Sequence, residues 1–244
     1  MQDSFKNVWL NNAGFDGHST FGHLVLLNDY EKKMRPGLIL FLIGINDVES
    51  DQPSFHDKLN TREHTRILNL LLNMVRGWHA QEFNNTTNSM LAMNNNNQLV
   101  IPEEAIQKRL SVQKSYLDKF HEQLAELADT CPQYKITPVF ITQPNQFGIG
   151  IDSDTGTSLE SYKLDNNMNG KLLWRLLELY NDVTRNTTRE KKIDVIDLAN
   201  LLPKNSRYFY DNPDFTNEGA EKIATLIKNA LCPLLQKKFP GYQN

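Results

Sequence analysis

Three short segments combine glycine with amide and carboxylate side chains, a mixture that suits ligand binding. They are residues 12–19 (Asn-Ala-Gly-Phe-Asp-Gly-His-Ser), residues 44–47 (Gly-Ile-Asn-Asp) and residues 211–219 (Asp-Asn-Pro-Asp-Phe-Thr-Asn-Glu-Gly). The first two follow apolar runs and the third precedes a helical pattern. All three should therefore lie at the carboxyl ends of strands or in the loops beyond them, where open α/β sheets bind their ligands.

Each segment also has a purely structural interpretation. Gly14 and Gly17 can serve a tight turn, and Asn46 with Asp47 can cap the segment that follows. Residues 216–218 can simply open a helix. The order of the three segments along the chain carries more functional information than any one of them.

Apolar runs that alternate with amphipathic stretches are the elements that position these segments. The sequence predicts strands at 8–10, 38–43, 139–141 and 193–198, and helices at about 19–34, 61–78, 102–129, 169–187 and 217–235. Residues 38–43 form a continuous apolar run, typical of a strand buried on both faces of a parallel sheet. Residues 84–98 and 146–158 are expected to be loops.

Strands that alternate with long helices indicate βαβ units, and hence a parallel sheet with right-handed crossovers and helices on both faces. The sequence contains no internal repeat and no linker that would separate two cores. We therefore expect residues 1–244 to form a single three-layer α/β/α domain.

In this order, the segments resemble the SGNH (GDSL-type) esterase and lipase family, from residue 8 to about residue 235. The second block of that family is a glycine after a strand, which Gly14 matches, and its third block is Gly-x-Asn-Asp, which residues 44–47 match fully. Its fifth block, Asp-x-x-His before the last helix, is matched by Asp211 but has Asp214 at the histidine position. The resemblance implies a flavodoxin-like parallel sheet of strand order 2-1-3-4-5.

The resemblance also implies ester hydrolysis through an acyl-enzyme, with no metal and no cofactor. The backbone N–H of Gly14 and the side-chain amide of Asn46 would be oxyanion-hole donors, and Asp211 would orient a catalytic imidazole. Asp214 replaces that imidazole, and an aspartate with a pKa of about 3.9 is a poor base for a serine hydroxyl. No histidine follows His121. His18 is an alternative base, although a surface or capping role explains it better.

The first block of the family, a Gly-Asp-Ser that carries the nucleophile, has no match in the sequence. Ser4 lies too close to Gly14, and Ser153 has no apolar strand leading into it, so neither suits the nucleophile; Ser19 is better explained as a helix cap. The strand that bears this block would lie between residues 8–10 and 38–43. We therefore expect either a natural protein that continues upstream or a genuinely shortened one.

Two functions of different classes follow from these observations. The first is an SGNH-type serine ester hydrolase that is inactive as given, because it lacks the serine block and has Asp214 in place of histidine. The second is a catalytically inactive relative that binds an acyl or glycan ligand in the former cleft. A plain interaction domain is a third interpretation. The expected partner is a small ester or an acylated glycan or lipid, and the sequence predicts neither the substrate nor the oligomeric state.

The composition of the chain excludes further classes of function. The 26 Lys and Arg residues do not exceed the 29 Asp and Glu residues, and the net charge of −3 gives no basis for nucleic-acid binding by counterion release. The apolar runs are shorter than the roughly 20 residues that cross a bilayer, so we expect no integral membrane contact. The two glycine-rich phosphate-binding motifs, Gly-x-Gly-x-x-Gly and Gly-x₄-Gly-Lys-Ser/Thr, do not occur in the sequence.

Cys131 and Cys232 are too few for a disulfide framework or a cysteine zinc site. We expect two buried free thiols, with a single bridge as the alternative. The first residues have neither the basic nor the apolar region of a signal peptide. We therefore expect the sequence as written to be cytoplasmic, and the compartment of the natural protein stays open.

Overall fold

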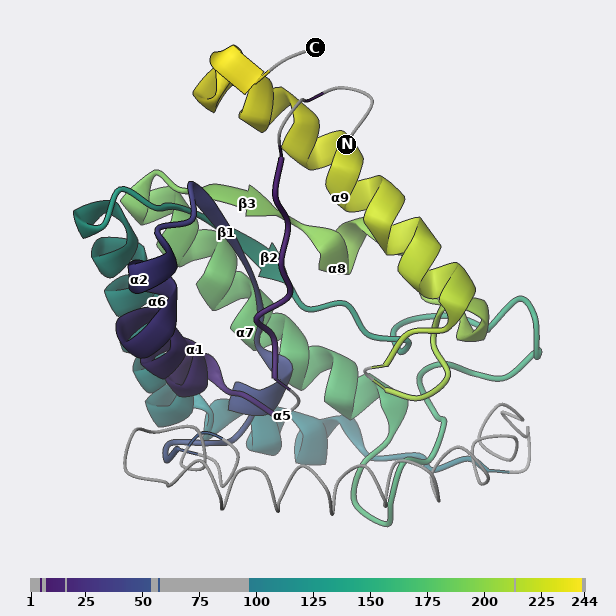
Figure 1. Cartoon of the computed structure of the whole chain (residues 1–244). Helices are drawn as coiled ribbons and strands as arrows, with labels where there is room; N and C mark the ends of the chain where they lie inside the picture. The colour runs from purple at the N-terminus through teal and green to yellow at the C-terminus, as the bar shows by residue number, and fades with distance from the viewer. Residues whose placement is uncertain are drawn as a thin grey trace, which may run out of the picture.

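The computed structural model describes residues 5, 8–15, 17–53, 57, 97–212 and 214–242. A three-stranded parallel sheet lies at its centre, in the order β1 (Leu38–Ile43), β2 (Thr137–Thr142) and β3 (Asp194–Ile196) (Figure 1). The predicted strands at 38–43, 139–141 and 193–198 are therefore confirmed, as is their parallel arrangement. The register places Leu38 beside Thr137 and Ile43 beside Thr142, so β1 and β2 end at the same edge.

One face of the sheet is covered by the helices on the left and below in Figure 1. They are α1 (Thr20–Leu26), the π-helical turn η1 (Leu27–Glu31), α2 (Lys32–Met34), α6 (Lys114–Gln133) and α7 (Gly170–Lys191). Phe41 of β1 and Phe140 of β2 stack with ring centroids 5.4 Å apart, and pack with Leu27, Phe120 and Tyr180 from these helices. This is the larger of the two cores that flank the sheet.

The other face is covered by α8 (Leu198–Leu201) and α9 (Asn217–Lys238). Val139, Ile141 and Ile196 from the strands pack there with Leu198 and Leu231 from the helices. The described part of the chain thus has helices on both sides of a parallel sheet. The other described elements are η2 (Ile45–Asp47), α5 (Glu103–Ser111), η4 (Ser206–Tyr208) and η5 (Pro240–Tyr242).

The predicted helix at 102–129 is divided into α5 and α6 by Val112 and Gln113. Gln113 is fully buried, and its side-chain amide donates hydrogen bonds to Glu49 Oε1 at 2.7 Å and to the Arg109 carbonyl at 3.1 Å. The break between α5 and α6 places the Gln113 amide against the loop after β1. Tertiary hydrogen bonds therefore override the helical pattern of the sequence.

Two strand predictions need correction. Residues 8–10 do not form a strand, and Trp9 and Leu10 are 67% and 70% exposed. β1 is buried mainly on one face: Phe41 and Ile43 are buried, whereas Leu40 and Leu42 are 37% and 38% exposed. Among the described residues, Leu38 is the only residue of β1 that packs with the core beneath α8 and α9. In the described ranges, no strand pairs with the outer edge of β1.

Several sequence predictions fall partly or wholly on residues that the structure does not describe. The helix at 61–78 and residues 84–96 of the predicted loop lie outside the described ranges, and so does Ser4. The described helices include none that is both long enough and apolar enough to span a bilayer. The predicted helices at 19–34, 169–187 and 217–235 are confirmed, with ends shifted by a few residues.

Candidate functional site

The segment at 44–47 lies where β1 ends, as its position after an apolar run predicts. Gly44 is buried and has a φ of +132°, a conformation that favours glycine, and η2 follows it directly. The exposed side chain of Asn46 projects from this turn and donates a hydrogen bond from Nδ2 to the carbonyl oxygen of His18, at 2.9 Å. The structure therefore joins the first two predicted segments.

Two buried carboxylates hold the beginning of α1. Thr20 donates its backbone N–H and its hydroxyl to the two oxygens of Asp47, both at 2.9 Å. Ser19 donates in the same way to Asp57, at 3.0 Å from N and 2.6 Å from Oγ. We call Ser19, Thr20, Asp47 and Asp57 the α1 carboxylate cluster. Negative charge is favoured at this end of a helix, where backbone N–H groups are otherwise unpaired.

Burial governs the protonation of groups around this cluster. It raises the pKa of Asp47 to about 7, against the hydrogen bonds from Thr20, which lower it. The nearby charge of Asp57 adds to the increase. Burial also lowers the pKa of His23 on α1 to about 4, with a further contribution from His18. The His23 imidazole is therefore neutral at pH 7, while Asp47 titrates near that pH.

Ser19 and Asp57 show what the sequence could and could not reveal here. Ser19 stands directly before α1, as predicted, but its side chain makes no cap hydrogen bond to the helix and donates to Asp57 instead. Asp57 has no glycine or amide neighbours of the kind that marked the three segments, so nothing in the sequence singled it out. His18, the alternative base, is buried and stacks on Phe15 with ring centroids 5.1 Å apart, so the surface role expected for it is wrong.

Gly14, the other predicted oxyanion donor, is exposed and lies in a segment without regular secondary structure. Its backbone N–H donates to Oδ1 of Asn12 at 2.9 Å. A Cβ at Gly14 would meet that Asn12 oxygen at 3.1 Å and has no positive φ to accommodate. The tight-turn interpretation fits Gly17, which has a φ of +73°, and not Gly14. The Gly14 N–H is already used by the exposed side chain of Asn12, which can rotate away.

The third segment forms a turn in front of α9. The backbone N–H of Asp214 donates to Oδ1 of Asp211 at 3.2 Å, and the N–H of Tyr210 donates to the carbonyl of Asp214 at 3.2 Å. Asp214 is exposed and Asp211 is half-buried. Thr216 then caps α9 by accepting the N–H of Gly219 at 3.0 Å. The structure brings Asp211 and Asp214 together, in a turn separate from the hydrogen bond between Asn46 and His18.

The other Asp-Ser pair, at 152–153, organises a loop. The fully buried Asp152 accepts the backbone N–H groups of Asp154, Thr155 and Ser206. Burial alone would raise the pKa of this carboxyl, but these hydrogen bonds lower it overall. The Ser153 hydroxyl accepts a hydrogen bond from the Asn205 amide at 2.6 Å. Asp152 therefore links the 152–157 loop to the first residue of η4, and Ser153 links it to Asn205 directly before η4.

A second carboxylate at the carboxyl end of the sheet was not predicted. Asp197, next to β3, accepts two hydrogen bonds from Arg185 of α7, at 2.9 and 3.0 Å, and one from Thr142 at the end of β2, at 2.8 Å. Despite partial burial, which raises the pKa of Asp197, these contacts lower it overall. This ion pair fastens α7 to β2 and β3. Its partners are far apart in sequence, so no local pattern signals it.

No metal centre was predicted, and the two cysteines were expected to be buried free thiols, with a single bridge as the alternative. Among the described residues, no group of three or more His, Cys, Asp or Glu side chains could hold a metal ion. Cys131 and Cys232 are both free; Cys131 is buried and Cys232 is half-buried. Burial raises the pKa of the Cys131 thiol to about 12, so it is not a thiolate at neutral pH.

Comparison with known proteins gives one distant structural similarity. No family model and no curated protein matches the sequence. A solved structure, that of LAE5, an α/β-hydrolase enzyme from the metagenome of Lake Arreo, Spain, is similar over 88% of this chain and 68% of that chain. The sequence identity is 15% and the TM-score is 0.45. Membership of the SGNH family therefore stays a prediction from the motifs.

Proposed function

We propose that this chain carries the oxyanion-binding part of an SGNH-type ester hydrolase, and that its 244 residues bind an acyl ester without turning it over. The observation that carries the proposal is the Gly-x-Asn-Asp turn at the end of β1, whose Asn46 is tied to the start of α1. Acyl transfer places negative charge on a carbonyl oxygen, which fixed neutral donors stabilise.

Asn46 has a donor to spare for such an oxygen. A side-chain amide has two N–H donors, and the hydrogen bond to His18 uses one of them and fixes the orientation of the group. The residue is exposed, so a ligand can reach the second N–H. The Gly14 N–H would become a second donor if the Asn12 side chain rotated away from it.

The absence of turnover follows from the residues at the other catalytic positions. Asp214 stands where the SGNH family has histidine, and it is part of an exposed turn with Asp211. The Ser19 hydroxyl, in the segment whose His18 carbonyl Asn46 contacts, donates to a buried carboxylate. An acyl-enzyme needs an activated nucleophile beside a base, and these contacts supply neither.

The first test is hydrolysis of p-nitrophenyl acetate. We expect the folded protein to be no faster than the same protein after heat denaturation. Turnover that disappears on serine modification would contradict this part of the proposal.

The second test is binding of a panel of acetyl and butyryl esters, followed by calorimetry. Asn46→Ala should weaken binding about five- to tenfold, the effect of one hydrogen bond, and the exposed Asn229→Ala on α9 should not change it. Equal affinity of the Asn46→Ala variant and the unaltered protein would remove the basis of the proposal. Binding of an acetylated glycan, lost in the same variant, would favour the second function, a ligand-binding relative without catalysis.

A further inference from the structure

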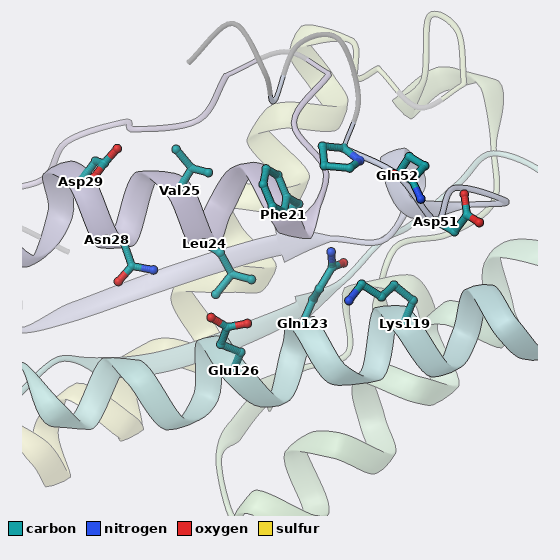
Figure 2. A pocket seen from close by; sticks show the side chains of 11 residues that line it. Phe21, Leu24, Val25, Asn28, Asp29, Asp51, Gln52, Lys119, Gln123 and Glu126 are labelled. Atoms are coloured by element: carbon teal, nitrogen blue, oxygen red, sulfur yellow. The ribbon is translucent and has the colours of Figure 1, made fainter. Parts of the chain in front are cut away.

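A groove between α1 and α6 forms a second candidate site on the molecule (Figure 2). Its volume is about 580 Å³, within the range of small-molecule sites. It lies on the outer side of α1, whereas the proposed ester site lies at the turn after β1. The inference below therefore goes beyond the proposed function and does not depend on it.

The two walls of the groove differ in chemistry. Phe21 and Leu24 of α1 point from one side, and Lys119, Gln123 and Glu126 of α6 point from the other, as Figure 2 shows. Further polar side chains come from Asn28 and Asp29 of η1 and from the loop at 51–52. A ligand in the groove would therefore meet an apolar surface on one side and amides and carboxylates on the other.

Several of these polar groups have hydrogen-bonding capacity that the protein does not use. Across the ranges that the structure describes, no hydrogen bond or ion pair engages the side chains of Asn28, Asp51, Gln123 or Glu126. Two amides and two carboxylates that face one cavity offer both donors and acceptors to a bound molecule. The π-helical turn that supplies Asn28 is itself an irregularity of a kind often found at functional sites.

We propose that this groove binds a neutral saccharide. A sugar ring has a face of C–H groups that can lie against the Phe21 ring and Leu24, and an edge of hydroxyls that can both donate to carboxylates and exchange hydrogen bonds with amides. The groove has three carboxylates, Asp29, Asp51 and Glu126, against one cation, Lys119, which also pairs with Glu122 at 3.2 Å. This charge repels anionic ligands such as uronates and sugar phosphates.

The proposal is tested with the 244-residue protein and a panel of sugars. The panel consists of the methyl glycosides of glucose, galactose, mannose and N-acetylglucosamine, with glucuronate as the anionic probe. Saturation-transfer NMR detects binding and calorimetry measures the affinity. We expect saturable binding of at least one neutral sugar, and binding of glucuronate at least about tenfold weaker because of the carboxylates.

Variants then assign the binding to the groove. Gln123→Ala removes an amide from the surface of α6, and Glu126→Gln replaces a charged acceptor by a neutral amide, which weakens the hydrogen bonds that sugar hydroxyls donate to it. Each change should weaken binding about fivefold or more. Gln133→Ala is the matched control, since it removes an exposed amide from the same helix outside the groove. It should bind as the unaltered protein does. Circular dichroism and thermal melting confirm that each variant is folded.

Three results would overturn the inference: no binding by any neutral sugar in the panel, glucuronate binding as tight as that of the neutral sugars, or binding that Gln123→Ala and Glu126→Gln leave unchanged. If sugar binding were lost in Asn46→Ala but kept in Gln123→Ala, the sugar would occupy the turn after β1. That result would overturn the groove assignment while it supported the proposed function, so the two can fail separately.

Discussion

Two pairs of aspartates follow strands of the same sheet, and the protein uses them in opposite ways. Asp47 and Asp57 are buried, and each accepts a backbone N–H and a hydroxyl from the start of α1. Asp211 and Asp214 lie in a turn at the surface, where a single backbone hydrogen bond joins them. Aspartate side chains thus hold the start of a helix in the buried region and stabilise a turn in the exposed region. The surroundings, and not the residue type, distinguish the two roles.

The difference shows that the place of a residue in a family motif does not determine its contacts or its protonation in the structure. The motif resemblance assigned a catalytic role to the surface pair, yet it named only Gly14 and Asn46 near the buried pair. The structure gives the buried pair the greater number of hydrogen bonds, and burial raises the pKa of Asp47. The following expectations test how far the two regions differ, by changing matched residues in each.

The largest contrast should come from removing one carboxylate in each region. Asp57→Ala leaves the N–H and hydroxyl of Ser19 buried without their acceptor, which should cost about 3 kcal/mol of unfolding free energy. Asp211→Ala loses one solvent-exposed turn hydrogen bond and should cost about 0.5 kcal/mol. Urea denaturation of both variants measures the difference. Equal losses would mean that burial does not set the roles of the two pairs.

The second contrast concerns pH. The folded pKa of Asp47, about 7, is above its unfolded value of 3.8, so the folded state binds the extra proton. The contribution of this group to stability is therefore fullest below about pH 4 and is lost as the pH rises to 7. At pH 8, Asp47→Asn removes the buried charge and should stabilise the protein by about 1–3 kcal/mol.

Thermal melting at pH 5.5 and pH 8 checks this expectation. The Asp47→Asn variant should show a flatter pH profile than the unaltered protein. Glu31→Gln is a useful companion, because burial raises the pKa of Glu31 to about 7 as well, and its effect has the same sign. If Asp47→Asn were less stable than the unaltered protein by the same amount at pH 8 and at pH 5.5, the charge of Asp47 would not cause the pH dependence of stability.

A smaller contrast distinguishes the beginnings of α1 and α9. Ser19→Ala removes a hydroxyl that donates to a buried carboxylate, and should cost about 1.5–2 kcal/mol. Thr216→Ala removes a cap that accepts the Gly219 N–H, and should cost about 1 kcal/mol. Urea unfolding at pH 7 measures both. A greater loss for Thr216→Ala would reverse the order expected from burial.

The smallest effect should be that of Gly14→Ala. Because Gly14 is exposed and a Cβ there meets only the Asn12 side chain, we expect a change within about 0.5 kcal/mol. Gly22→Ala is the contrasting variant, since its Cβ would lie 2.2 Å from Asp57 Oδ1 within the α1 carboxylate cluster. It should cost about 2–3 kcal/mol in the same unfolding measurement. Similar losses of unfolding free energy in the two variants would show that the α1 carboxylate cluster moves at little cost to accommodate the added Cβ.

The sequence predicted those parts of the fold whose signal is local. Residues 38–43 and 169–187 have apolar patterns long enough to identify a strand and a helix without knowledge of their neighbours. The three apolar residues at 8–10 were too few, because a strand needs a partner and the described chain gives them none. The helix break at Gln113 depends on Glu49, which is distant in the sequence.

The candidate site was likewise predicted only where its signal is local in the sequence. The turn at 44–47 was placed correctly because it follows a clear strand. Its contact with the 12–19 segment was not predicted, and residues 8–10, the strand expected before that segment, form none. Asp57 was missed because its role depends on Ser19, and a lone aspartate between unrelated residues has no pattern. The roles given to Gly14, Asn46, Asp211 and Asp214 stay predictions until ligands and variants test them.

The outer edge of β1 has a consequence for the behaviour of the protein in concentrated solution. Its sequence, Leu-Ile-Leu-Phe-Leu-Ile, is uncharged and contains neither proline nor glycine, and Leu40 and Leu42 are partly exposed beside it. In the described part of the chain its backbone N–H and C=O groups on that side meet no strand. An edge of this composition is a template for adding strands from other molecules, the first step toward cross-β aggregates. Whatever shields these six residues therefore determines the colloidal stability of the protein as well as its fold.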